Sequence, residues 1–197
     1  MTEPIGIPAP EAVGDIVPGV PPVPITVWYV PAARAGETMS FLLAERLVMN
    51  FTHHGRRMVL DLTSGEQVSQ AAHAARRRYA RHTPDDLTAS TYPAALVVSG
   101  WPVPDTDADA LLADCAARLM VGGCAAVVLG AGELTVNQLL IAAARSAGLT
   151  YLQHIVAAHD LTERRGQLGD AGTHLSAHSD VLIFSSSLSG LRGPVHD

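Results

Sequence analysis

The fold of this chain is decided by the stretch Met58-Val59-Leu60-Asp61-Leu62-Thr63-Ser64-Gly65-Glu66-Gln67. A short apolar run ends in an acidic residue, a small-residue turn with one glycine follows, and a helical pattern begins after it. This order is typical of a strand–loop–helix unit that binds a nucleotide where the strand ends. The carboxylate of Asp61 can accept a hydrogen bond from a ligand, and Gly65 lets a ligand approach the backbone closely. In the alternative interpretation, Asp61 only caps the next helix and Gly65 only makes the turn.

Apolar runs and helical patterns alternate on both sides of this stretch. Strands are predicted at 25–30, 58–62, 94–99, 124–129, 149–157 and 180–185, and helices at 37–53, 66–81, 106–120 and 135–147. The strands are continuous runs of Val, Leu, Ile and Ala, which favours a mostly parallel sheet covered by helices on both faces. Since no clear helix separates the last two strands, we expect them to pair antiparallel at one edge, with 25–30 as an extra edge strand. The predicted class is α/β, Rossmann-like.

Length and composition indicate one globular domain. The chain has 197 residues, of which 48% are hydrophobic and 16% are charged, as in ordinary globular proteins. Residues 1–24 hold seven of the thirteen prolines, which disfavours both helices and sheet ladders there. We expect 1–24 to be an extended arm, either wrapped on the domain or a partner or left as a disordered tail, and 25–190 to be the single domain.

Charge argues against a protein that binds nucleic acid by itself. The net charge is −6, whereas stand-alone nucleic-acid binders are usually basic. Arginines cluster locally at Arg76, Arg77, Arg78 and Arg81. These side chains could contact phosphate, or they could form a solvated helix face.

Cysteine usage and hydropathy point to a cytoplasmic protein. Cys115 and Cys124 lie in apolar segments without a metal or redox spacing, so we expect buried thiols in a reducing compartment. No apolar run has the length of a membrane span. The Pro-rich, acidic beginning lacks the basic start of a signal peptide.

Histidines offer weak alternatives for a metal site. His174 and His178 could join Asp180, and His154 and His159 could join Asp160. Neither set lies on a predicted helix face with a regular ligand spacing. We therefore expect no metal.

Four segments, taken in order, carry a resemblance to a known family. Val59–Gly65 aligns with the motif hydrophobic-Leu-Asp-x-Phe-x-Gly-x-Gly, and Ala95–Pro102 aligns with a strand followed by Ser/Asp/Asn-Pro-Pro-aromatic. Arg118–Gly123 matches Arg-x-Leu-x-x-Gly-Gly, and His178–Phe184 is similar to a closing strand. Over about residues 37–185 the chain resembles class I S-adenosylmethionine-dependent methyltransferases. It is most similar to the DNA methyltransferases that modify the exocyclic amine of adenine or cytosine.

The resemblance implies a site built from two strand ends. In this family the second motif grips the target amine and stacks on a flipped base, and an aromatic ring can still provide that stacking here. The residues that the resemblance assigns to the cofactor are Asp61, Thr63, Gly65 and Glu66. The residues that it assigns to catalysis are Ser99, Trp101 and Pro102.

The chain departs from the family pattern in four places, the first being Thr63 in place of the Phe of the first motif. Gln67 stands at the second glycine of the first motif, and Gly100-Trp101 replaces Pro-Pro in the second. Only 37 residues separate Asp61 from Ser99, where the family usually fits two further strands, the first ending in an acid for the ribose. We expect no such strands, and no room for a domain that recognises a DNA target.

These departures lead to a prediction with one alternative. We predict a degenerate, reduced methyltransferase fold, catalytically impaired, that acts as a regulatory or partner subunit and binds S-adenosylmethionine weakly or not at all. The alternative is an S-adenosylmethionine-dependent methyltransferase that acts on an exocyclic amine of DNA. Because the missing strands would expose a sheet edge, we expect a homo-oligomer, most simply a two-fold dimer, or a partner protein that covers it.

Overall fold

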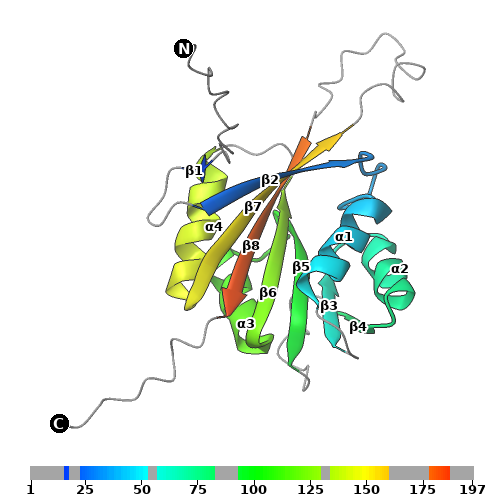
Figure 1. The fold of residues 1–197 in the computed structure, drawn as a ribbon. Coiled ribbons are helices and arrows are strands. Elements are labelled where there is room, and N and C mark those ends of the chain that lie inside the picture. Colours follow the sequence, from blue (N-terminus) through cyan, green and yellow to red (C-terminus); the bar gives the residue numbers. More distant parts are fainter. Residues whose placement is uncertain are drawn as a thin grey trace, which may run out of the picture.

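A mixed sheet of eight strands organises the chain (Figure 1). The computed structural model describes residues 16–17, 23–52, 57–82, 93–129, 134–159 and 178–186. The strands are β1 (Ile16–Val17), β2 (Val23–Val30), β3 (Met58–Leu62), β4 (Arg78–Arg81), β5 (Ala94–Trp101), β6 (Leu119–Leu129), β7 (Leu149–His159) and β8 (His178–Ser186). The helices are α1 (Phe41–Phe51), α2 (Gln67–Ala74), α3 (Ala108–Arg118) and α4 (Leu134–Ser146).

The strand order confirms the predicted α/β class. It is β1-β2-β7-β8-β6-β5-β3-β4, and the pairs β2–β7, β3–β4, β3–β5 and β5–β6 are parallel. β8 is antiparallel to both β6 and β7, as expected for the last two strands. β8 lies inside the sheet rather than at its edge, because it pairs with β6 on one side and β7 on the other. β7 is not at the edge either, since β2 pairs with its outer side. The two residues of β1 then form the antiparallel edge.

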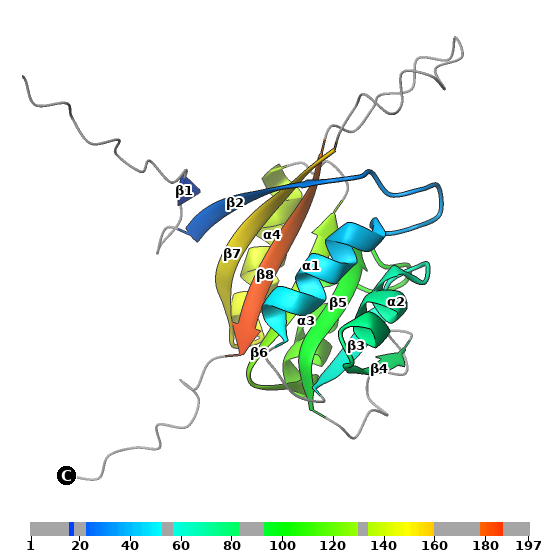
Figure 2. The ribbon, with the colours of Figure 1, turned by 45° about the vertical axis from the view of Figure 1, so that its right-hand side comes forward.

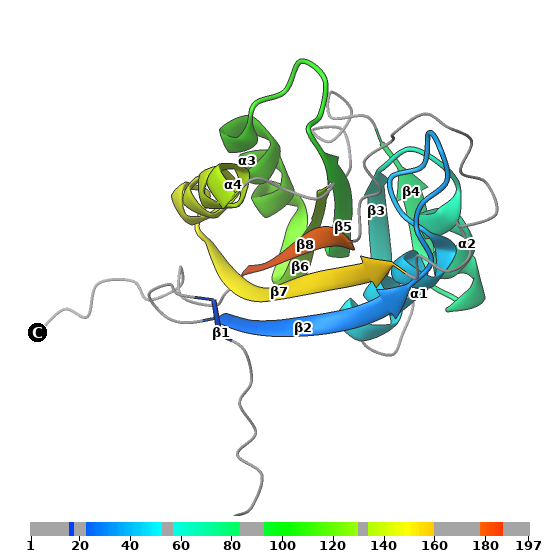
Figure 3. The same ribbon diagram turned by 90° about the horizontal axis from the view of Figure 1, so that it is seen from above.

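The helices cover both faces of the sheet, as predicted. α1 and α2 pack side by side on one face, and α3 and α4 pack together on the other (Figures 2 and 3). Each pair closes its own apolar cluster, centred on Leu47 and Val98 under α1 and α2, and on Leu112 and Phe184 under α3 and α4. A parallel sheet that is buried on both faces needs continuous apolar strands, which is the pattern in the sequence.

Helix α1 shows how local sequence positions the edge of the site. The Ser40 side chain accepts a hydrogen bond from the backbone N–H of Leu43 at 3.4 Å, which caps the first turn. Leu43, Leu47 and Val48 then recur on one side and are buried against the sheet. The cap fixes the direction in which residues 31–40 enter the helix, and these residues border the cavities described below.

The helix predicted over 66–81 is wrong in its second half. α2 ends at Ala74, and Arg76 has a left-handed backbone with φ 53°, which stops the helix. The chain then forms β4, which pairs parallel with β3 so that Asp61 lies beside Arg81. The expectation that no further strand lies between Asp61 and Ser99 is therefore also wrong. β4 has only four residues, with an arginine at each end. It therefore lacks the apolar run that would distinguish a strand from the end of a helix in the sequence.

Other boundaries differ by a few residues. β6 begins at Leu119, five residues before the predicted strand start at 124, so Gly122-Gly123 lies within a strand. β7 and β8 extend beyond their predicted ends to His159 and Ser186. Most of the predicted arm 1–24 lies outside the described residues, and the domain limits stay a prediction.

Candidate functional site

The two strand ends singled out in the sequence lie side by side. β3 and β5 are parallel neighbours, with Asp61 beside Val98 and Leu62 beside Ser99. Adjacent parallel strands end at the same side of a sheet, about 5 Å apart. The expectation that the two strand ends are neighbours is therefore confirmed.

The carboxylate of Asp61 is fully buried and is satisfied by the chain itself. Its Oδ1 accepts hydrogen bonds from the Thr63 backbone N–H at 2.9 Å and from the Thr63 hydroxyl at 2.6 Å. Its Oδ2 accepts a hydrogen bond from the Tyr79 hydroxyl at 2.8 Å. Burial, and then the bond to Asp61, raises the pKa of Tyr79 to about 12. Both carboxylate oxygens thus have partners within the chain, as a buried charge requires.

Arg81, at the end of β4, lies across the loop between β3 and α2. Its guanidinium donates to the Glu66 carboxylate at 2.7 Å and to the Gly65 carbonyl, and it lies 3.4 Å from Oδ2 of Asp61. The hydrogen bond to Glu66 raises the pKa of Arg81. Three of the four residues assigned to the cofactor by resemblance, Asp61, Gly65 and Glu66, are thus joined through one arginine. Sequence reasoning missed this role because it placed Arg81 in a helix.

The turn at Gly65 is occupied by the chain's own Gln67. Gly65 has φ 92°, a conformation that favours glycine, and an added Cβ would collide with Oε1 of Gln67. That oxygen is buried and has no hydrogen-bond partner among the described residues. The Gln67 amide therefore fills the space that a second glycine would leave open.

The three residues assigned to catalysis have different environments. Ser99 is buried, and its hydroxyl donates to the Gly100 carbonyl at 2.9 Å. Trp101 is partly exposed and packs against the apolar cluster under α3 and α4. Pro102 is exposed. Trp101 and Pro102 line a cavity, whereas the Ser99 side chain bonds within its own strand.

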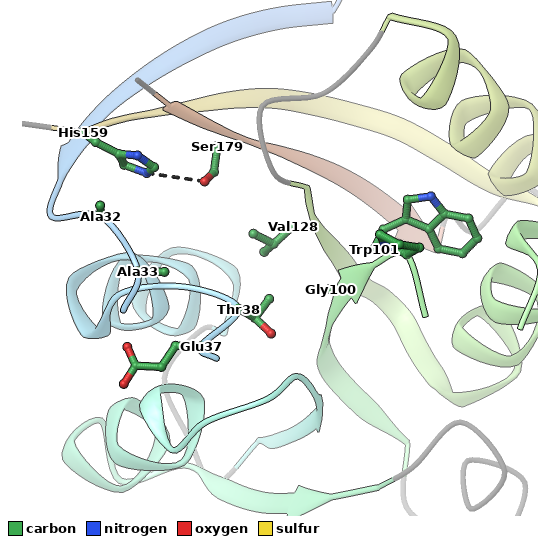
Figure 4. A pocket seen from close by; sticks show the side chains of 10 residues that line it. Ala32, Ala33, Glu37, Thr38, Gly100, Trp101, Val128, His159 and Ser179 are labelled. Carbon is green, nitrogen blue, oxygen red and sulfur yellow. Dashed lines mark hydrogen bonds between the residues drawn. The ribbon is translucent and has the colours of Figure 1, made fainter. Parts of the chain in front are cut away.

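This cavity, of about 360 Å³, lies at the carboxyl end of the sheet (Figure 4). His159 and Ser179 form one wall, where Nε2 and Oγ are 3.4 Å apart, and Glu37 and Thr38 face them. Gly100 permits this approach, since a Cβ there would come within 2.9 Å of the Thr38 methyl group. Five separate segments contribute, so no local pattern in the sequence could reveal the cavity.

A second cavity, of about 650 Å³, lies over Gly65, Glu66 and Gln67. It is bounded on the other side by residues from 31–42 and shares Glu37 with the first cavity. Thr38 ties this segment to the β3–α2 loop, because Ser64 N–H donates to its hydroxyl at 3.0 Å. The two cavities therefore flank one polar segment at the start of α1.

The described residues contain neither a metal cluster nor a spanning helix. Within them, no three His, Cys, Asp or Glu side chains are grouped so as to hold a metal ion. His154 instead lies 3.0 Å from Asp180, and His174 and Asp160 fall outside the described residues. No helix in the described ranges is long and apolar enough to cross a membrane.

No protein-family model and no curated protein matches the chain. Solved structures with the same fold do match it. Geranyl diphosphate methyltransferase in complex with GPP and sinefungin is 12% identical, over 75% of this chain and 79% of that chain, with a TM-score of 0.53. A Haloferax volcanii methyltransferase in complex with the Trm112 methyltransferase activator is 14% identical, over 73% and 88%, with a TM-score of 0.52. The chain therefore has the Rossmann-like fold of class I S-adenosylmethionine-dependent methyltransferases.

Proposed function

We propose that this protein is a methyltransferase-fold regulatory or partner subunit whose own side chains bond to the groups that the resemblance assigns to the cofactor. The observation that carries the proposal is the position of Arg81, which bonds to Glu66 and Gly65 and lies beside Asp61. A cofactor that used these groups would first have to break hydrogen bonds to charged partners. Because the Arg81 and Glu66 side chains are both exposed, the bond between them contributes at most about 1 kcal/mol.

The end of β4 supports the same conclusion. In the family that the chain resembles, the strand after the first motif ends in an acid that binds the ribose. Here that strand is β4, and it ends in Arg81. A guanidinium has five N–H donors and no acceptor, so it cannot accept hydrogen bonds from ribose hydroxyls. Arg81 thus puts a hydrogen-bond donor where the family has an acceptor for the ribose. Its N–H groups donate to Glu66 and Gly65 of the chain itself.

A partner role is consistent with the fold. A solved protein of this fold, the Haloferax volcanii methyltransferase, is in complex with the Trm112 methyltransferase activator. In the present chain, β2 has no charged residue, and its exposed Val27 and Tyr29 point away from the core. An uncharged strand near a sheet edge is a suitable surface for another chain.

Titration calorimetry with S-adenosylmethionine and sinefungin tests whether these groups are available to a cofactor. We expect no saturable binding by the natural protein below about 1 mM. The double variant Gln67→Gly, Arg81→Ala removes both obstructing side chains and should bind at least about tenfold more tightly. Arg78→Ala, an exposed arginine on the same strand, is the matched control and should behave like the natural protein. Micromolar affinity in the natural protein would contradict the proposal.

The cavity beside Trp101 and Pro102 favours a second candidate function. It lies where the resemblance places the target amine, so an S-adenosylmethionine-dependent methyltransferase acting on an exocyclic amine of DNA is the alternative. Transfer of a labelled methyl group to duplex DNA, abolished by Trp101→Ala, would support the alternative. No transfer at enzyme concentrations near that of the DNA would exclude it.

A further inference from the structure

A basic hollow lies where the chain passes from α2 into β4. Its volume is about 290 Å³, and it is lined by His73, Arg76, Arg77 and Arg78. This connection leads into the first residue of β4, so the hollow is at the amino end of the strands, opposite the two cavities described above (Figure 1). All four lining residues are basic or histidine. Three arginines of the cluster seen in the sequence line this hollow. The fourth, Arg81, does not line it and pairs with Glu66.

The backbone at Arg76 is unusual for the residue that occupies it. The N–H of Arg76 bonds to the His73 carbonyl at 3.0 Å and that of Arg77 to the Ala72 carbonyl at 2.8 Å. This pair of bonds forms the helix-terminating motif whose left-handed position is usually glycine. In α4 the corresponding left-handed residue is Gly148, with φ 77°. At α2 the chain places an arginine with φ 53° there, although glycine would relieve the strain.

Arg77, which lines the hollow, is held in a fixed orientation by hydrogen bonds to the chain. Its Nε donates to the Thr52 hydroxyl at 2.7 Å, Nη2 donates to the Thr52 carbonyl at 3.0 Å, and Nη1 donates to the Ala75 carbonyl at 3.0 Å. These bonds keep one positive charge in place and cover a carbonyl at the end of α2. The side chains of Arg76 and Arg78 are exposed beside it. An anion that enters the hollow therefore meets guanidinium groups rather than helix carbonyls.

We infer that this hollow binds the phosphate group of a small phosphorylated molecule. Guanidinium groups present paired N–H donors that match phosphate oxygens. The exposed side chains of Arg76 and Arg78 line this small space, and Arg77, whose guanidinium donates to the chain, adds a fixed positive charge beside them. The net charge of −6 opposes a long polyanion but does not prevent one phosphate from binding to a local basic cluster. This site is separate from the proposed cofactor site and does not depend on it.

Titration calorimetry of the full chain at low salt compares AMP, pyrophosphate and adenosine. AMP and pyrophosphate should bind at least about tenfold more tightly than adenosine, and raised salt should weaken both. If AMP and adenosine bind equally, the inference is wrong. A single-stranded DNA oligonucleotide is the third probe. Affinity that rises steeply with its length would replace the small ligand with a nucleic-acid backbone and would also overturn the inference.

Arg76→Gly separates binding from folding. Glycine adopts the left-handed conformation without strain, so the variant should melt at or above the temperature of the natural protein. It should also bind AMP at least about tenfold more weakly, because it lacks one guanidinium. Arg145→Ala, which removes an exposed arginine from α4 on the other face, should leave AMP binding unchanged. Unchanged AMP binding by Arg76→Gly would overturn the assignment.

Discussion

Removing the Tyr79 hydroxyl tests how the site around Asp61 is held together. Tyr79→Phe keeps the ring that packs against the cluster under α1 and α2, so it creates no cavity. It removes the 2.8 Å hydrogen bond to Oδ2 of the buried Asp61 carboxylate. The remaining neighbour of that oxygen is Arg81, at 3.4 Å. In the variant, Oδ2 of the buried Asp61 carboxylate therefore keeps only the long contact to Arg81.

The expected loss follows from the charge on the acceptor. A hydrogen bond to a charged group contributes roughly 1.5–3 kcal/mol, and Tyr79 is only partly buried, so we expect about 2 kcal/mol. For a domain of this size, 1 kcal/mol changes the melting temperature by about 2–4 °C, and the expected decrease is therefore about 4–8 °C. Asp61→Asn in the same background should reduce the effect of Tyr79→Phe to below about 1 kcal/mol, since the charged acceptor is then absent.

Urea unfolding of both single variants and the double variant measures this coupling. Tyr29→Phe is the matched control, because Tyr29 is 77% exposed and its hydroxyl faces solvent. The control should stay within about 0.5 kcal/mol of the natural protein. If Tyr79→Phe and Tyr29→Phe have the same small effect, Asp61 is not held by Tyr79 and the reasoning fails.

Four further predictions concern pH, thiols, the tryptophan and assembly. Burial raises the pKa values of Tyr79 and Tyr151 to about 12, whereas an unfolded tyrosine titrates near about 10. The free energy of unfolding, measured in urea, should therefore be constant up to about pH 10 and decrease towards about pH 12. The decrease should be less steep in Tyr79→Phe, which lacks one of the two hydroxyls. Burial raises the pKa of Cys115 to about 12 and that of Cys124 to about 11, so a thiol reagent should modify neither until the protein is denatured. Trp101→Ala should lower the free energy of unfolding by about 2 kcal/mol, because the ring is only half-buried; a loss above about 4 kcal/mol would assign the ring to the core instead. Light scattering at micromolar concentration should detect a dimer, and a monomer would contradict the expected self-association.

The sequence by itself determined the parts of the fold that depend on local pattern. Met58–Leu62 forms a strand with the predicted bounds because its continuous apolar run can be buried on both faces of a sheet. The apolar period likewise predicted α1, although the predicted start at residue 37 is four residues early, because the Ser40 cap begins the helix at Phe41. The resemblance of the motifs to class I methyltransferases agreed with the fold for the same reason, since the first two motifs are each one strand and the turn after it.

The tertiary structure alone decided what the site contains. β4 forms because Arg78–Arg81 pairs with β3, and a four-residue segment without an apolar run has no local preference strong enough to predict that pairing. Arg81 reaches Glu66 and Asp61 from 15 and 20 residues away, so its role appears only once the two strands lie side by side. The cavity beside Trp101 likewise joins Thr38 to Ser179, which no window of sequence includes. Contacts between distant segments depend on strand order, and strand order is a property of the whole sheet.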